Sequence, residues 1–184
     1  MSKNNNAFWG MDLLKNVKVL SCVALFVAIS IVAGKFLAIS LGDTLRISFE
    51  NLTIILTGMM FGPIVGALAG TCADILGCIL RGYNIIPILT VGAACIGFVS
   101  GILYNAFNRF SEYFRVPLCC LFSHILGSVV IKTIGLSLYY KSPFVETLIF
   151  RSINYLIVFV AETFVLIFLI KNKGFISQID RIKR

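Results

Sequence analysis

Ionisable side chains inside long apolar stretches are the residues of this sequence most able to do chemistry. Seven of them interrupt segments that are otherwise apolar: Lys35, Glu50, Asp74, His124, Lys132, Arg151 and Glu162. An ionisable group within the hydrocarbon layer of a membrane is costly, and it usually faces a polar cavity or a partner group. Each of the seven is therefore a candidate for a role in function.

Two groups of polar residues are spaced so that each shares one face of a helix. Asp74, Cys78 and Arg81 follow an i, i+4, i+7 pattern. A second group follows an i, i+3, i+4, i+11 pattern: Arg151, Asn154, Tyr155 and Glu162. Asp74 and Arg81 are expected in the outer half of one helix, and Arg151, Asn154 and Tyr155 in the outer half of the other. Two polar faces at the same depth predict a polar cavity open to the outside. The alternative is that Arg46, Arg81 and Arg151 extend along apolar surface to the interface, which a short carboxylate such as Asp74 cannot do.

The lone histidine does not predict catalysis. No serine, cysteine or aspartate is arranged around His124 for nucleophilic chemistry, and GxSxG, HExxH and GxxxxGK[ST] are absent. Without a P-loop the chain is not expected to hydrolyse ATP by that route. We expect His124 to be a satisfied histidine near the inner end of its helix, and Glu162 to pair with Lys132 in a structural role.

The six cysteines form no CxxC pair, and no Cys/His cluster with metal spacing is expected among them. All six lie in apolar stretches, where cysteine behaves as a small packing residue. We therefore expect no disulfides and no metal site.

The elements that must position these residues are membrane helices. Of the 184 residues, 59% are hydrophobic and 13% charged, whereas soluble domains are about 45–50% apolar and about 25% charged. The net charge of +8 is concentrated near the chain ends and forms no basic face with interleaved aromatic residues, which excludes nucleic acid as a partner. The sequence predicts an integral membrane protein in contact with lipid.

Apolar runs and their breaks predict an all-α membrane bundle of six transmembrane helices, forming a single domain over residues 1–184. Pro63 separates the second and third helices, because proline removes a backbone donor, and Pro143 precedes the sixth. The predicted helices are 18–40, 48–61, 63–80, 85–108, 116–140 and 146–170. Six spans place both termini on one side, and the excess of Lys and Arg near the termini predicts that this side is the cytoplasm.

Four short motifs follow one another along the chain. They are an AxxxA row at Ala24 and Ala28, LRISF at 45–49, LTGMMFGP at 56–63 and ADILG at 73–77. In this order they resemble the folate-family S components, the substrate-binding subunits of energy-coupling-factor (ECF) vitamin transporters. The segment after ADILG departs from the Pro- and Gly-rich stretch that is common in that family.

The resemblance implies a multi-pass protein of the bacterial plasma membrane that is not an enzyme. Such a subunit captures folate from outside and delivers it inward with a transmembrane coupling subunit and two cytoplasmic ATPases. ATP is then used by the partner subunits, and this chain needs no cofactor. Docking onto the coupling subunit would use Ala24 and Ala28, whose small side chains leave a flat strip for close helix packing.

The resemblance also implies roles for the polar residues. The pterin ring presents an amino group and a ring N–H side by side, and Asp74 can accept hydrogen bonds from both. The glutamyl carboxylates need cations, for which Arg81 and Arg151 are predicted, with Arg46 as a possible gate. Asn154 is predicted to bond the pterin or the amide. Aromatic faces for the flat rings are predicted from three residues: Phe49, Tyr83 and Tyr155.

Three other hypotheses remain open. The chain could be an S component for thiamine, riboflavin or a queuosine precursor, although cations at the outer end favour a ligand with carboxylates. An intramembrane enzyme would need a catalytic partner for His124. A secondary transporter would show two similar halves, and residues 1–92 and 93–184 show no such likeness.

Overall fold

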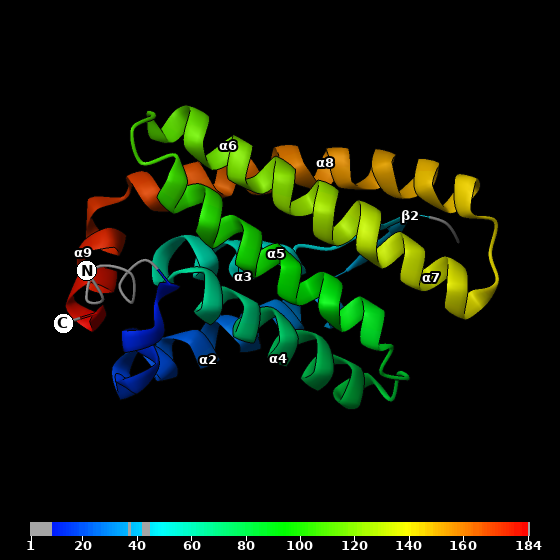
Figure 1. The fold of residues 1–184 in the computed structure, drawn as a ribbon, viewed down its shortest axis with the longest axis horizontal. Helices are drawn as coiled ribbons and strands as arrows, with labels where there is room; N and C mark the ends of the chain where they lie inside the picture. The colour runs from blue at the N-terminus through cyan, green and yellow to red at the C-terminus, as the bar shows by residue number, and fades with distance from the viewer. Residues whose placement is uncertain (1–8, 37, 42–44, 184) are drawn as a thin grey trace.

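The computed structural model describes residues 9–36, 38–41 and 45–183, apart from the side chains of residues 35–36, 39–41 and 45–47. Within these ranges the chain is a helical bundle with one short β-hairpin (Figure 1). The elements are, in order, η1 (Met11–Lys15), α2 (Val17–Ile31), η2 (Val32–Phe36), β1 (Ile39–Leu41), β2 (Leu45–Ile47), α3 (Glu50–Phe61), α4 (Pro63–Arg81), α5 (Pro87–Ala106), α6 (Glu112–Ser123), η3 (His124–Ile131), α7 (Lys132–Tyr140), α8 (Phe144–Lys171) and α9 (Lys173–Lys183). Of these, η1 is a 3₁₀-helix, and η2 and η3 are π-helices.

Glycine and proline separate the three central helices. Gly62 lies between α3 and α4 with φ of 98°, a backbone conformation that a side chain would strain. Pro63 then takes the first position of α4, where its missing N–H is harmless. Gly82 ends α4 with φ of 66°, and Pro87 opens α5 in the same way. These breaks allow α3, α4 and α5 to pack side by side.

The first predicted helix, over residues 18–40, is too long. In the structure α2 and η2 end at Phe36, and an antiparallel hairpin follows in which Ile39 pairs with Ile47. Each strand has only three residues, ISL and LRI, so their pairing with each other defines them. The expected turn at residues 42–44 lies outside the described residues. The all-α prediction therefore misses a hairpin, and β2 of this hairpin contacts α8.

The long helices on one side of the bundle differ slightly from the predicted ranges. The elements α6, η3 and α7 form one continuous helix, which begins at Glu112 rather than at residue 116. The helix α9, which was not predicted, is amphipathic and buries Ile179. Figure 1 shows α9 and the blue start of α2 at one end of the bundle, with β2 and the α7–α8 turn at the opposite end.

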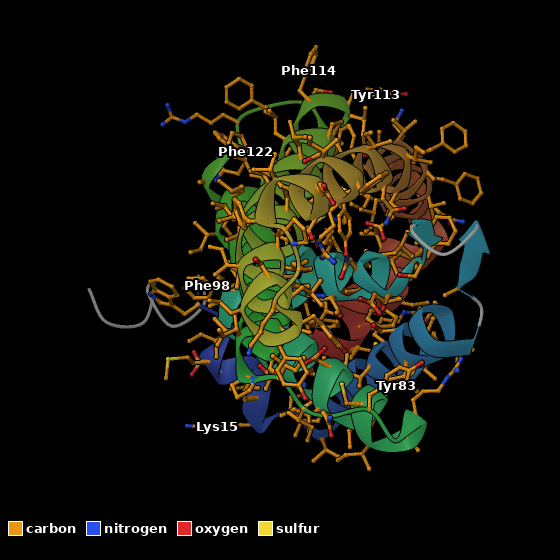
Figure 2. All side chains as sticks on the ribbon, turned by 90° about the vertical axis from the view of Figure 1, so that its right-hand side faces the viewer. Lys15, Tyr83, Phe98, Tyr113, Phe114 and Phe122 are labelled. Atoms are coloured by element: carbon orange, nitrogen blue, oxygen red, sulfur yellow. The ribbon has the colours of Figure 1, made fainter. Side chains whose placement is uncertain are left out.

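The outer faces of the helices are apolar. Among the described residues, five helices are long and apolar enough to cross a membrane: Val17–Gly34, Pro63–Arg81, Pro87–Ala106, Glu112–Tyr140 and Phe144–Lys171. The apolar helix α3 is shorter, with 12 residues. Figure 2 shows Tyr113, Phe114 and Phe122 at the outside of the bundle, where all three are exposed. Large exposed apolar side chains of this kind suit a surface that faces lipid.

The helices α4 and α5 approach each other through small residues. A Cβ on Gly97 would collide with the backbone oxygen of Gly66, and one on Gly70 would collide with that of Ala93. Small residues at such positions let the backbones of membrane helices come into contact. The α4–α5 pair is therefore a closely packed wall, and it carries Asp74 on α4 and Thr90 on α5.

Candidate functional site

A polar cavity of about 240 Å³ lies in the half of the bundle that carries the hairpin. Its lining comes from the start of α3 and from α4, α5, α7 and α8. The lining residues are Ser48, Glu50, Asp74, Leu89, Lys132, Leu136, Phe150, Arg151, Asn154 and Tyr155. Apolar and aromatic side chains thus lie beside a few polar and charged ones, as in sites that bind small molecules.

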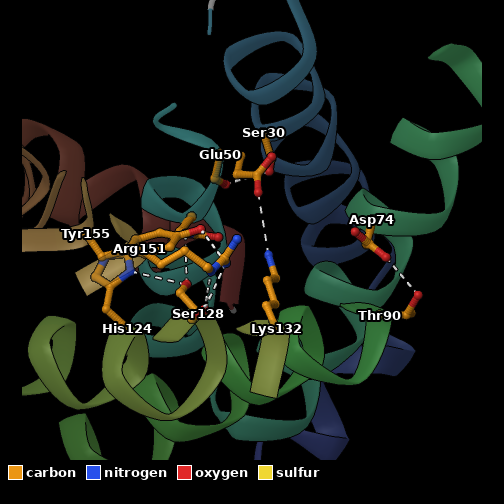
Figure 3. Close-up of polar contacts among 10 residues, drawn as sticks. Ser30, Glu50, Asp74, Thr90, His124, Ser128, Lys132, Arg151 and Tyr155 are labelled. Carbon is orange, nitrogen blue, oxygen red and sulfur yellow. Dashed lines mark hydrogen bonds and ion pairs between the residues drawn. The ribbon is translucent and has the colours of Figure 1, made fainter. Parts of the chain in front are cut away.

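Asp74 forms one wall of the cavity from α4. The hydroxyl of Thr90 on α5 donates to Asp74 Oδ2 over 2.7 Å (Figure 3). The carboxylate is therefore oriented by a neighbouring helix that is held against α4 by direct backbone contact. Such an oriented carboxylate can accept paired hydrogen bonds from a ligand.

Lys132 and Glu50 form an ion pair at the edge of the cavity. Lys132 Nζ lies 3.5 Å from Glu50 Oε1 (Figure 3). Lys132 is only 7% exposed although its side chain ends in an amine. The start of α3 is fixed on α2, because Ser30 Oγ donates to the backbone oxygen of Glu50 over 2.6 Å. The pair therefore joins α7 to α3 at the edge of the cavity.

Arg151 is held in place by the backbone of the facing helix. Its Nη2 and Nε donate to the carbonyl oxygen of Ser128 in η3, over 2.8 and 3.3 Å. Its Nη2 also lies 3.4 Å from the hydroxyl of Tyr155, and its guanidinium carbon lies 5.2 Å from the centre of that ring. The guanidinium is thus positioned before any ligand arrives, which lowers the ordering cost of binding.

The described lining of the cavity holds two acidic and two basic side chains. Among its described lining residues, Glu50 and Asp74 carry negative charge in their usual states, and Lys132 and Arg151 carry positive charge. A buried ion pair gains little net free energy, because desolvation offsets the attraction. A ligand that brings its own donors and carboxylates can therefore replace internal partners at low cost.

The structure brings together half of the residues that the sequence analysis assigned to the site. Asp74, Arg151, Asn154 and Tyr155 line the cavity. Three others do not line it. Arg81 and Tyr83 are exposed at the α4–α5 turn, and Phe49 is exposed beside the cavity. The side chain of Arg46 lies outside the described part of the chain, so its predicted role stays a prediction.

Two charged residues of the cavity were missing from the predicted site. Glu50 and Lys132 had the signal that marks such residues, since both are ionisable groups in apolar stretches. Their partnership could not be predicted, because 82 positions separate them along the chain. Lys35, which has the same signal, has its side chain outside the described residues.

The predicted pairing of Glu162 with Lys132 is wrong. Glu162 Oε2 lies 2.7 Å from His124 Nε2, and Lys132 is turned toward Glu50 instead. The expectation that His124 lies near the helix end is also wrong, because this residue is buried in the middle of the long α6–η3–α7 helix and is 1% exposed. Its ring packs against that of Tyr155, with 5.3 Å between the ring centres.

Comparison with known families decides which class of membrane protein has this architecture. A family model described as the S component of an ECF-type riboflavin transporter matches residues 14–174. The chain belongs to the ECF-type S components. It is therefore a multi-pass membrane protein of a transporter family.

Individual relatives of this S component differ in how much of their length they share with it. The folate transporter FolT of Clostridium novyi is 30% identical over 129 residues, which cover 68% of this chain and 72% of that protein. The uncharacterized MG313 homolog of Mycoplasma pneumoniae is 24% identical over 134 residues. The match covers 72% of this chain but only 47% of that protein, about half of its length. A crystal structure of FolT bound with folic acid has the same fold, with a TM-score of 0.69 and 24% identity over 83% of this chain and 92% of that one.

The alanine row of this S component lies on the outer surface of α2. Ala24 and Ala28 are both exposed, and the larger side chains of Leu25 and Ile29 on the same helix are exposed as well. The two alanines thus leave a shallow strip between bulkier apolar residues. Such a strip permits a helix of another chain to approach closely.

Proposed function

We propose that this S component captures folate from outside the cell in the cavity between α4, α7 and α8. The observation that carries the proposal is the arrangement of charges: Asp74 forms one wall, and Lys132 and Arg151 lie on the helices opposite. Folate has the complementary pattern, with a ring that donates paired hydrogen bonds at one end and two carboxylates at the other. The likeness to FolT in sequence and fold supports the same ligand.

In this proposal each end of folate has its own residues. The pterin amino group and ring N–H donate to Asp74. The hydroxyl of Thr90 on the neighbouring helix α5 keeps this carboxylate in orientation. Arg151 and Lys132 bind carboxylate, Asn154 bonds the pterin or the amide, and the flat rings lie against Tyr155.

The ligand extends beyond the cavity. A volume of about 240 Å³ is below the range of about 300–1,000 Å³ that is usual for small-molecule sites. We assign the outer part of the glutamyl tail to Arg81 and Arg46, and the exposed rings of Phe49 and Tyr83 to the same entrance. Positive groups there also raise the rate at which an anion arrives.

The transport step belongs to a larger assembly. We propose six transmembrane spans, with α3 as the short one, and both termini in the cytoplasm. Ala24 and Ala28 dock onto a transmembrane coupling subunit, and two ATPase subunits supply the energy. In this scheme the chain is a binding subunit rather than an enzyme, and only the partner ATPase subunits bind and hydrolyse ATP.

Riboflavin is the second candidate, because the matching family model is described by that vitamin. Riboflavin has no carboxylate, so Arg151 and Lys132 would have no charged group of the ligand to bind. Isothermal titration of the detergent-purified chain with folic acid, 5-formyltetrahydrofolate, riboflavin and thiamine separates the candidates. We expect nanomolar binding of a folate and no binding of the other two. Binding of riboflavin with both folates silent would contradict the proposal.

A further inference from the structure

A second polar cluster lies deeper in the bundle, beyond Tyr155. It consists of Cys120 on α6, His124 at the start of η3 and Glu162 on α8, which are 0%, 1% and 0% exposed. One sulfur, one ring nitrogen and one carboxylate oxygen of these residues lie within 4.8 Å of one another. None of the three lines the folate cavity.

The helix geometry explains how the cluster forms. Cys120 and His124 are spaced i, i+4, so their side chains lie on one face of the helix, one turn apart. Glu162 faces them from α8, which packs against α6 and η3. Wide π-helical turns are frequent at functional sites in proteins, and here the π-helical segment η3 begins at His124.

Glu162 gives independent evidence that a ligand belongs there. Its Oε2 is close to His124 and the backbone N–H of Leu52 lies near the carboxylate, but its Oε1 is buried and has no partner at full hydrogen-bonding geometry among the described residues. A buried acceptor without a partner is costly, and more so when it belongs to an ionised group. A cation bound between the three side chains would satisfy this oxygen.

Neighbouring residues are arranged as the second layer of a metal site. The Oγ of Ser128 lies 3.4 Å from His124 Nδ1, and the side-chain amide of Asn51 donates to that Oγ over 3.4 Å. Groups that contact the outer nitrogen of a ligating histidine fix its orientation and tautomer. The cluster could not be predicted from the sequence, because Glu162 is 38 positions from His124 and only the fold brings them together.

We propose that Cys120, His124 and Glu162 bind a zinc ion. Thiolate, imidazole and carboxylate together suit Zn²⁺, whereas Mg²⁺ and Ca²⁺ prefer oxygen ligands alone. The charges support the choice, since a thiolate and a carboxylate cancel the two positive charges of the ion inside an apolar bundle. Three protein ligands leave a fourth position for water.

Binding requires a small rearrangement. Two ligand atoms that each lie about 2.0–2.1 Å from a tetrahedral zinc ion are about 3.3 Å from each other. In the structure His124 Nε2 and Glu162 Oε2 are only 2.7 Å apart. The ion replaces the proton between them, a second proton leaves the Cys120 thiol, and the pair separates by a few tenths of an ångström. Because the ring of Tyr155 packs on His124 and also lines the cavity, the ion fixes one wall of the folate site from behind.

Metal uptake by the full chain in detergent, without a polyhistidine tag, tests the proposal. We expect dialysis against Zn²⁺ or Co²⁺ to leave one equivalent per chain, measured by elemental analysis. The Co²⁺ form should show a thiolate-to-metal charge-transfer band and the intense visible bands of tetrahedral cobalt. Clearly substoichiometric metal, or a cobalt spectrum without thiolate, would overturn the proposal.

Matched variants assign the site. Cys120→Ser and Glu162→Gln should weaken Zn²⁺ binding by about tenfold or more, whereas Cys119→Ser, at an adjacent buried cysteine, should bind like the wild type. Zn²⁺ should raise Tm in the wild type and in Cys119→Ser but not in Cys120→Ser. Wild-type affinity in Cys120→Ser would show binding elsewhere, for example at the exposed Cys72, and would refute the assignment.

Discussion

The substitution Asp74→Asn tests how the pterin end is bound. Asparagine keeps the shape of the side chain and leaves an oxygen that can still accept the 2.7 Å bond from Thr90. The change removes the negative charge and places an N–H₂ donor where the ligand also has donors. One hydrogen bond to a charged group contributes about 1.5–3 kcal/mol. The Kd for folic acid should therefore rise about ten- to hundredfold, since 1.4 kcal/mol corresponds to a factor of ten.

Two ligands make this measurement specific to one end of the molecule. Isothermal titration should be done with folic acid and with p-aminobenzoylglutamate, which has the carboxylate tail but lacks the pterin. We expect Asp74→Asn to weaken only the binding of folic acid. Thr90→Val is the matched control on the neighbouring helix. It removes one neutral-to-charged bond behind the carboxylate but keeps the charge, so a smaller loss of about two- to tenfold is expected.

Two outcomes would refute the reasoning. An unchanged Kd for folic acid in Asp74→Asn, with an unchanged Tm, would remove Asp74 from the binding site. An equal loss for both ligands would show that the substitution disturbs the cavity as a whole rather than a contact with the pterin.

The remaining predictions concern the opposite wall, the helix packing and the docking surface. Arg151→Gln should weaken both folic acid and p-aminobenzoylglutamate by about tenfold or more in the same titrations, and an effect on folic acid alone would contradict the carboxylate assignment. Gly97→Val should destabilise the bundle by about 1–3 kcal/mol through overpacking against α4, seen as a lower Tm in detergent, and a Tm equal to the wild type would show that α4 and α5 are not tightly packed. Ala24→Trp and Ala28→Trp should leave folate binding intact but abolish uptake in vesicles that contain the whole complex, whereas Val160→Trp, on the exposed face of α8, should affect neither. Normal uptake with both alanine variants would refute the docking role.

Sequence reasoning places the helices well where the local chemistry decides. Pro63 and Pro143 mark real helix boundaries, because a proline fits the first turn of a helix but not its interior. It fails after residue 36, where the apolar run continues but the chain turns into a hairpin. Strands of three residues such as β1 and β2 are too short to give a clear periodic pattern, and only their pairing with each other defines them.

The candidate site shows the same division between local and distant information. The face formed by Arg151, Asn154 and Tyr155 could be predicted, since spacing along one helix determines which residues share a face. The partners of Lys132 and Glu162 could not, because they depend on which helices become neighbours. Both charged residues were recognised as unusual in an apolar stretch, but they were predicted to pair with each other, whereas the fold pairs Lys132 with Glu50 and Glu162 with His124.

The π-helical segment η3 has a consequence for how the long helix can change in length. The backbone N–H of Lys132 bonds the carbonyl of Gly127, one residue further back than in an α-helix. A wide turn of this kind holds one extra residue, so deleting one residue from η3 would restore α-helical bonding and leave the flanking helices α6 and α7 facing as before. Lys132 and Cys120 would keep their places, and only the side chains inside the turn would shift. Relatives that differ by one residue in this turn would thus present different chemistry between the two polar clusters on the same scaffold.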